Sequence, residues 1–389
     1  MQSTRRGSYV ETAVGGERVR AFVPPPLPPD PRIDIQEVLP LLVEAERAVA
    51  RLDGISSVLP DTGLFLYMYV RKEALLSSQI EGTQSSLSDL LLFEIDDAPG
   101  VPLDDVREVS NYVKAMTHGL KRLRDNDFPL SVRLLREIHG ILLSRGRGAD
   151  QDAGEFRRSQ NWIGGTRPGN AEFVPPPPDH VGSCMSDLER FLHETSSGLP
   201  TLIKAGLAHV QFETIHPFLD GNGRLGRLLI TLLLCAEGVL RAPLLYLSLY
   251  FKTHRQTYYS LLQRVREDGA WEDWLEFYLE GVRDTAAQAA RTAQRILELF
   301  AADRAKIETL GRAASSAVRV HDRIKEDPLL SIPAASRQLN LAQPTVSRAV
   351  EQLTRLGVLK EITGRSRGRI FAYEAYLAIL SEGTEPLPR

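Results

Sequence analysis

The chain has 389 residues, of which 43% are hydrophobic and 25% are charged, as is ordinary for a globular protein of two or three domains. Its formal net charge of −3 excludes a protein that coats nucleic acid with its whole surface, and leaves room for a basic patch on one domain. Two cysteines, Cys184 and Cys235, lack metal-ligand spacing and are interpreted as reduced thiols, so we expect a cytoplasmic protein.

The N-terminal third is expected to be extended at first and then helical. No apolar stretch of the signal-peptide kind is present at the start. Residues 1–34 are interpreted as an extended, proline-rich segment, because VPPPLPPDP at 23–31 must adopt polyproline-like geometry. From 35 to 125, apolar residues recur at three- and four-residue spacing, which predicts a helical N-terminal region.

Residues 126–310 are expected to form the main helical core. Within it, NWIGG and AEFV flank TRPGN, a pattern that predicts a β-hairpin flap over 160–178. One helix must end near His216, because Pro217 disfavours helical geometry in the residue before it. The apolar run at 228–240 belongs to the next helix and is too short to span a bilayer, so no membrane contact is expected.

Residues 315–389 follow a different plan. Two helical segments precede a third that has Pro344 at its start and Gly357 at its end. The stretches VLKEITG and RIFAYEAY, joined by RSRG, predict a hairpin. Three helices and a hairpin make a winged helix-turn-helix. The whole chain is therefore expected to be mainly α, with a β-hairpin flap in the core and a winged helix at the C-terminal end.

A winged helix is typical of DNA binding, in which the third helix enters the major groove and the wing meets phosphates. The residues expected at such contacts are Gln343, Thr345, Ser347, Arg348, Arg365, Arg367 and Arg369. The alternative is a winged helix used for packing or dimerisation, because the domain also carries Glu351, Glu361 and Glu374. The sequence leaves both uses open, and a homo-oligomer is compatible with it.

The stretch HPFLDGNGRLGR at 216–227 carries the strongest chemical signal. Its DGNG turn can adopt positive φ angles, so that successive amides converge on an anion at the start of the following helix. Arg224 and Arg227 share one face of the first helical turns, where cations oppose the helix dipole. A polyphosphate at the helix start would offset that repulsion.

The same stretch supplies a metal ligand and a base. Asp220 can provide the single carboxylate that a phosphate-bound Mg²⁺ typically takes. His216 is the side chain in the stretch suited to accept a proton near neutral pH. Together these residues indicate nucleotidyl or phosphoryl transfer.

This stretch resembles the signature of the Fic (filamentation induced by cAMP) family, HPFx[D/E]GNGRxxR, at every specified position. The resemblance extends to the helical N-terminal region, the flap and the C-terminal winged helix. Most members of the family transfer AMP from ATP to a Ser, Thr or Tyr hydroxyl of a target protein and release pyrophosphate. The resemblance implies a protein adenylyltransferase with ATP as substrate and Mg²⁺ as cofactor.

The resemblance also implies residue roles. His216 would deprotonate the hydroxyl, and Asp220 would hold Mg²⁺. The phosphate-binding set would comprise Gly221, Asn222, Gly223, Arg224, Leu225, Gly226 and Arg227. Tyr259 falls where members place an aromatic side chain near adenine, and Ile163 in the flap is a second candidate for that pocket. The flap would hold the target segment by strand addition.

A second motif, SSQIEG, matches the family's inhibitory pattern [S/T]xxxE[G/N] through Ser77, Glu81 and Gly82. Ser77 and Glu81 are four apart and can lie on one helical face. In relatives this glutamate pairs with the second arginine of the signature, here Arg227, and competes with the γ-phosphate. The resemblance therefore implies inhibition in cis by an N-terminal helix.

Several alternatives stay open from the sequence. On the same fold, the chain could transfer phosphate or remove AMP, although the intact GNG turn favours AMP transfer. It could also be a DNA-binding regulator whose core senses nucleotide. Glu81 could be a solvated helix-end residue, and ordinary core packing is a comparable explanation for Tyr259.

Overall fold

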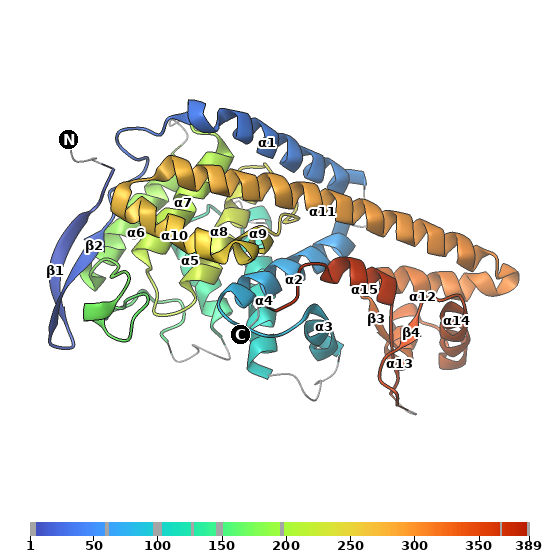
Figure 1. Cartoon of the computed structure of the whole chain (residues 1–389). Coiled ribbons are helices and arrows are strands. Elements are labelled where there is room, and N and C mark those ends of the chain that lie inside the picture. The colour runs from blue at the N-terminus through green and yellow to red at the C-terminus, as the bar shows by residue number, and fades with distance from the viewer. Residues whose placement is uncertain are drawn as a thin grey trace.

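The computed structural model describes residues 5–58, 62–95, 103–125, 128–144, 151–194, 198–365 and 368–386. As expected, the protein is mainly helical (Figure 1). Within the described ranges, no helix combines the length and the apolar character needed to cross a membrane.

A β-hairpin that the sequence did not lead us to expect opens the chain. Strands β1 (Ser8–Val14) and β2 (Glu17–Val23) pair antiparallel, with Ser8 opposite Val23 and Val14 opposite Glu17. Gly15 and Gly16, both at positive φ, form the two-residue turn that such a hairpin requires. The interpretation of residues 1–34 as one extended proline-rich segment was therefore wrong over 8–23, where paired strands replace isolated extended chain.

The core is a set of packed helices around two buried ones. Helix α7 (Thr201–Ile215) and helix α8 (Asn222–Ala236) pack against each other, and almost every residue of both is buried. Helix α1 (Ile35–Val58) lies along the long helix α11 (Trp271–Glu308) on one side of them (Figure 1). The remaining helices of the core are α2 (Thr62–Ile80), α3 (Leu87–Ile95), α4 (Leu103–Asp125), α5 (Val132–Leu142), α6 (Pro178–His193), α9 (Ser248–Thr253) and α10 (Arg255–Asp268).

The flap is less regular than the expected hairpin. A single antiparallel bridge joins Ile163 to Phe173, and a 3-10 turn, η1 (Pro168–Asn170), lies between them. Gly164 and Gly165 have positive φ values of 69° and 67°, which turn the chain out of the strand directly after Ile163. The flap therefore exposes only a short length of extended backbone.

The C-terminal region, in the part that the structure describes, contains four α-helices and a small sheet. Its elements are the turn η2 (Gly311–Ala313), α12 (Ala314–Glu326), β3 (Leu329–Ser331), α13 (Ile332–Leu339), α14 (Gln343–Arg355), β4 (Lys360–Glu361), β5 (Ile370–Ala372) and α15 (Glu374–Ser381). The strands form an antiparallel sheet in the order β3-β5-β4.

This region differs from the expectation in two places. Strand β3 adds a third strand to the expected hairpin, and the EAY of RIFAYEAY begins helix α15 instead of continuing a strand. Tyr376 and Leu380, four residues apart, are the buried side chains of that helix. The order helix, strand, helix, helix, strand, strand is the one that a winged helix requires, and we keep that classification, with the domain boundaries at 35, 126 and 315, as a proposal.

Candidate active site

His216 lies at the junction of the two central helices. Helix α7 ends at Ile215, and His216 takes left-handed backbone angles of φ 48° and ψ 59° while its N–H donates to the carbonyl of Phe212 over 2.9 Å. A residue other than glycine pays about 1–3 kcal/mol for such a conformation, so the surrounding structure must hold it. The expected helix end before Pro217 is confirmed, because helix α7 ends at Ile215.

The charge state of His216 is set by its surroundings. Burial first, and then the nearby guanidinium groups of Arg266 and Arg157, lower its pKa to about 3, against the opposing effect of Glu81. The imidazole is therefore neutral at pH 7 and able to accept a proton.

Asn222 shapes the turn that links His216 to helix α8. Its side-chain oxygen accepts from the N–H of Phe218 and its amide nitrogen donates to the Phe218 carbonyl, both over 2.9 Å. Gly221, at φ 75°, supplies the left-handed residue before the helix, and its N–H donates to Oδ1 of Asp220 over 2.7 Å. The side chain of Asn222 is thus used to hold the loop together. Only the backbone of this residue could contact a bound anion.

His139, to which the sequence assigned no role, contacts this turn at Asp220 and Phe218. Its Nδ1 accepts from the N–H of Gly154 over 2.8 Å, so the neutral ring carries its proton on Nε2 and donates it to the Asp220 carbonyl over 2.9 Å. The ring also stacks on Phe218, with centroids 3.7 Å apart. Burial lowers the pKa of His139 to about 4, which keeps this arrangement of donor and acceptor at neutral pH.

Arg157, also missed, joins the base of the flap to the backbone of His216. Only 2% of this arginine is exposed, and it donates to the carbonyls of His216 over 2.9 Å and Pro176 over 2.5 Å. Its own N–H donates to the Pro217 carbonyl over 3.0 Å. Because the acceptors are carbonyl groups, no residue type in the sequence indicated this contact.

The two arginines of the signature are buried, not solvated. Arg224 lies 2.7 Å from a carboxylate oxygen of Glu108 on α4, and both side chains are less than 5% exposed. It lies 3.7 Å from Asp220 as well. Glu108 had no signal in the sequence, since a helical glutamate 116 positions away is indistinguishable from a surface one.

Arg227 is bound by the segment 77–81 at the end of α2. Its Nε donates to the Ser77 hydroxyl over 2.8 Å, and one Nη donates to the Ser77 carbonyl over 3.0 Å and to Glu81 over 2.7 Å. The structure therefore brings together Ser77, Glu81 and Arg227. Gly82, at φ 103°, turns the chain away directly afterwards.

Glu81 occupies the N-terminal end of helix α8. A Cβ added at Gly223 would lie 2.2 Å from a carboxylate oxygen of Glu81, so the carboxylate rests against the first turn of that helix. Burial by itself would raise the pKa of Glu81, but Arg227 and Arg224 outweigh it and the pKa is lowered. The carboxylate is thus ionised and lies where the helix start and both arginines would attract an anion.

Two other members of the expected phosphate-binding set, Leu225 and Gly226, face the protein core. Leu225 is fully buried in the core and its N–H donates to the Gly221 carbonyl over 3.0 Å. An added Cβ at Gly226 would lie 2.4 Å from a carboxylate oxygen of Glu213 on α7, so Gly226 allows the two helices to approach. These two residues shape the helix, whereas Gly223, Arg224 and Arg227 surround the place where Glu81 lies.

A metal would have Asp220 as its protein ligand. The described residues contain no group of three or more His, Cys, Asp or Glu side chains arranged to hold an ion. The Asp220 side chain is 35% exposed, at the mouth of the site. One accessible carboxylate fits a Mg²⁺ ion that takes its other ligands from phosphates and water.

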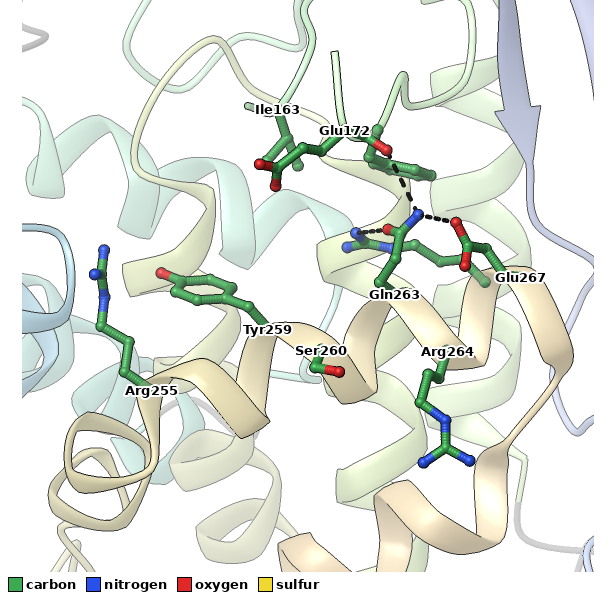
Figure 2. Close-up of a pocket in the computed structure, with 10 residues that line it drawn as sticks. Ile163, Glu172, Arg255, Tyr259, Ser260, Gln263, Arg264 and Glu267 are labelled. Atoms are coloured by element: carbon green, nitrogen blue, oxygen red, sulfur yellow. Dashed lines mark hydrogen bonds between the residues drawn. The ribbon is translucent and has the colours of Figure 1, made fainter. Parts of the chain in front are cut away.

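A pocket of about 840 Å³ opens between the flap and helix α10 (Figure 2). Tyr259 and Ile163 both line it, on opposite sides, with Phe173, Arg255 and Gln263. Tyr259 is 42% exposed, whereas its neighbour Tyr258 is fully buried and shares a hydrogen bond of 2.9 Å with His209. Core packing thus describes Tyr258, and Tyr259 presents its ring to the pocket.

Three of the residues expected to meet DNA lie close together in the C-terminal region. Gln343, Ser347 and Arg369 line a recess of about 410 Å³ with Ile332 and Pro344. Arg348 and Arg365 are exposed and Thr345 is partly buried, while Arg367 lies outside the described residues.

Comparison with known proteins agrees with this geometry. Residues 39–121 match the Fic/DOC family N-terminal region, and residues 129–234 match the Fic/DOC family domain. The protein adenylyltransferase Fic of Aedes aegypti is 33% identical over 231 residues, which are 57% of this chain and 43% of that protein. The chain thus spans less than half the length of this curated relative.

Solved structures agree on the fold. A Fic family protein from Desulfovibrio desulfuricans G20 superposes with a TM-score of 0.57 at 21% identity, over 90% of this chain and 98% of its own. A Fic-domain-containing signaling protein from Bacteroides thetaiotaomicron VPI-5482 superposes with a TM-score of 0.52 at 18% identity, over 64% of this chain and 97% of its own. Within residues 39–234 the chain thus contains a Fic/DOC family N-terminal region followed by a Fic/DOC family domain, and the turn at 216–227 lies in that domain.

Proposed function

We propose that the protein is an adenylyltransferase that transfers AMP from ATP to a Ser, Thr or Tyr hydroxyl of a target protein, and to itself. The observation that carries the proposal is a neutral histidine held beside a helix start on which two buried arginines and a carboxylate converge. Curated relatives that share the matched regions are named protein adenylyltransferase Fic.

In the proposed reaction, His216 accepts the proton of the target hydroxyl, and the oxygen attacks the α-phosphorus of ATP. The bond from that phosphorus to the bridging oxygen of the β-phosphate breaks, and pyrophosphate leaves. The helix start at Gly223 and the guanidinium groups of Arg224 and Arg227 would bind the phosphates. Mg²⁺ held by Asp220 would neutralise phosphate charge.

The pocket between the flap and α10 would take the nucleoside. Tyr259 offers an exposed aromatic face and Ile163 an apolar side chain opposite it, a combination that suits a planar base. The extended backbone at Ile163 and Phe173 would pair with the target segment near the acceptor hydroxyl.

We further propose that Glu81 inhibits the enzyme in cis. Its carboxylate is ion-paired to Arg227 and contacts the helix start, so ATP cannot place its γ-phosphate on that arginine unless Glu81 leaves. The expected residual activity of the wild type is therefore low.

The test uses α-³²P-labelled ATP with Mg²⁺ and four purified proteins: wild type, Glu81→Gly, His216→Ala and the double variant. We expect weak labelling of the wild type, strong labelling of Glu81→Gly and none when His216 is also replaced. Label that moves only from γ-labelled ATP would mean phosphoryl transfer, and loss of AMP from a labelled target would mean AMP removal. No movement of either label from Glu81→Gly would reject the proposal and favour a nucleotide-sensing regulator.

For the C-terminal region we propose a winged helix that binds DNA. Among the described residues, Arg337, Arg348, Arg365 and Arg369 lie around α13, α14 and the β4–β5 connection without a carboxylate in ion-pair range. By contrast, Arg323, Lys325 and Lys360 of the same region are paired with acidic residues. Unpaired cations on neighbouring elements suit a polyanion.

Binding of a random duplex, followed by fluorescence anisotropy, should weaken steeply as salt increases, because bound counterions are released. Replacing Arg348 with Ala should lower the affinity about tenfold, while replacing Arg323, which is already paired, should have little effect. Binding that responds neither to salt nor to Arg348→Ala would favour the use of this region for packing or oligomerisation. Gel filtration would reveal an oligomer.

A further inference from the structure

The segment that follows helix α15, Glu382–Pro386, leaves the C-terminal region and returns to the catalytic core. It lies against helix α2, about 300 positions earlier in the chain, and against helix α9, about 130 positions earlier. In Figure 1 it runs back from α15 towards α2. We call this segment the C-terminal strap. None of the roles considered above uses it.

Three buried side chains of the core donate hydrogen bonds to the backbone of the strap. Lys72 donates to the carbonyl of Glu382 over 2.8 Å, and Gln79 donates to that of Thr384 over 2.8 Å. Lys252 donates to the carbonyls of Gly383, over 3.2 Å, and Glu385.

These donors depend on the strap. Lys72 and Gln79 are each 1% exposed and Lys252 is 6% exposed. Among the described residues, neither lysine forms an ion pair with a carboxylate at hydrogen-bonding distance. Lys72 also lies over the Tyr246 ring, 4.6 Å from its centroid, but the strap carbonyls supply the hydrogen-bond acceptors of both lysines. A buried ammonium group that loses its acceptors is strongly unfavourable, and the core therefore favours the docked strap.

The strap also fits through its own side chains. Glu382 forms two hydrogen bonds of 2.7 Å with Arg295 of α11, and Thr384 is only 3% exposed. Gly383 has φ 78°, and a Cβ added there would lie 2.9 Å from Leu249 of α9. Glycine is thus required at that position both by the backbone angle and by the space.

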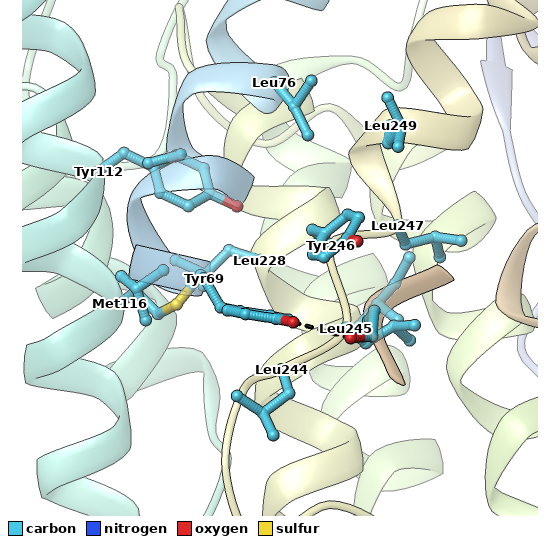
Figure 3. Close-up of a cluster of buried hydrophobic side chains, with 14 of the residues drawn as sticks. Tyr69, Leu76, Tyr112, Met116, Leu228, Leu244, Leu245, Tyr246, Leu247 and Leu249 are labelled. Atoms are coloured by element: carbon cyan, nitrogen blue, oxygen red, sulfur yellow. Dashed lines mark hydrogen bonds between the residues drawn. The ribbon is translucent and has the colours of Figure 1, made fainter. Parts of the chain in front are cut away.

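The helix that the strap contacts is the one that ends directly before Glu81. Lys72 and Gln79 belong to α2, and Gln79, two residues before Glu81, also donates to the Ser85 carbonyl across the turn that follows. Leu76 of α2 and Leu249 of α9, which touches Gly383, lie in the same buried cluster (Figure 3). The strap thus contacts α2 at Lys72 and at Gln79, and Gln79 lies between Ser77 and Glu81, the two residues that bind Arg227.

We propose that the C-terminal strap holds helix α2 in the position in which Glu81 binds Arg227, so that inhibition depends on the C-terminal region. The inference rests on the proposed inhibitory role of Glu81. Any event in the C-terminal region that pulls the strap from Lys72, Gln79 and Lys252 would loosen α2 and release Arg227 for the nucleotide.

Two full-length variants test the strap from opposite sides of the contact. Gly383→Val introduces a β-branched side chain at positive φ against Leu249, and Lys252→Met removes two hydrogen bonds while keeping an apolar stem. The matched control is Gly357→Val, at φ 73° after α14, where an added Cβ meets nothing within 4 Å. It carries the same backbone strain in the same region without touching the core.

Hydrogen exchange of the peptide spanning 68–86 is the readout that does not depend on activity. We expect both strap variants to speed its exchange roughly tenfold, because α2 would open locally more often, and the control to leave it unchanged. Labelling from α-³²P-ATP should rise above the wild type towards the level of Glu81→Gly in the strap variants only.

The outcomes separate the two proposals. Unchanged exchange in both strap variants, or labelling that stays at the wild-type level while Glu81→Gly is strongly labelled, would overturn the role of the strap. Faster exchange in 68–86 with no labelling of any variant, Glu81→Gly included, would support the mechanical link and reject the proposed AMP transfer.

Discussion

The chemistry proposed for this protein depends on single residues kept in one protonation state. His216 is the clearest case, because a base that accepts a proton must be neutral when the substrate arrives. Burial and two arginines keep it so, and Arg157 holds its left-handed backbone through a hydrogen bond to the His216 carbonyl. His139 and Asn222 fix the turn on the other side. The proposed base is thus positioned largely by side chains that hydrogen-bond to the backbone of its loop.

A pH profile checks this arrangement. Because the pKa of His216 is lowered from 6.5 to about 3, its neutral form persists as the pH falls through 6 and 5. For Glu81→Gly, kcat/KM for AMP transfer should therefore stay within about twofold between pH 7.5 and 5.5, measured with a target peptide in constant ionic strength. An acidic limb centred near 6.5 would show that His216 is exposed to solvent in the free enzyme.

At the scale of elements, the flap depends on a hairpin that precedes it by about 150 positions. Glu17, at the turn of the β1–β2 hairpin, accepts from Arg167 over 2.6 Å and from the N–H of Gly169 over 2.9 Å. At the other end of the hairpin, the N–H of Phe22 donates to the Val174 carbonyl over 2.9 Å. The flap, which has a single β-bridge of its own, is thus held at its tip and at its base.

Removing the contact at the tip should affect the protein substrate more than the nucleotide. In the Glu81→Gly background, Glu17→Ala should raise KM for the target protein about fivefold, because the flap must then be ordered by the target. KM for ATP should change by less than about twofold. Glu11→Ala, an exposed carboxylate on the same hairpin, is the control. Equal effects of the two variants would mean that the hairpin does not support the flap.

At the scale of the whole molecule, helix α11 connects the catalytic core to the C-terminal region. Its first part packs along α1, and its last part meets an aromatic cluster of Phe300, His321, Tyr373 and Tyr376. Within that cluster the Tyr373 hydroxyl donates to the carboxylate of Asp303 over 2.7 Å. Asp303 is 3% exposed, and its other carboxylate oxygen is ion-paired with Lys306 over 2.6 Å, so the two contacts together compensate a buried charge.

Tyr373→Phe should therefore lower the free energy of unfolding of the C-terminal region by about 2 kcal/mol. Tyr376→Phe should cost less than about 0.5 kcal/mol, because the Tyr376 hydroxyl finds no hydrogen-bond partner among the described residues. Urea denaturation, monitored by hydrogen exchange in α12 and α14, would measure the free energy of unfolding of both variants. Similar losses in the two variants would show that the junction is held by ring packing alone.

Much of the catalytic stretch could be predicted because its information is local. The end of α7 at Ile215 follows from Pro217, and the arrangement of Arg224 and Arg227 follows from helical spacing. The order of helices and strands in the C-terminal region was mostly predictable for the same reason. The N-terminal hairpin had a local signal as well, since Gly15 and Gly16 separate two alternating segments, but the prolines that follow drew the interpretation towards extended chain.

The sequence by itself determined the helical architecture, the turn at 216–227 and the four-residue spacing of Ser77 and Glu81, because each depends on neighbours in the chain. Only the tertiary structure decided that Glu108 pairs with Arg224, that His139 and Arg157 hold the loop of His216, and that the strap reaches α2. Most of these contacts join a side chain to a backbone carbonyl more than 50 positions away. Every residue has such a carbonyl, so the partner leaves no mark in the sequence until the fold brings the two together.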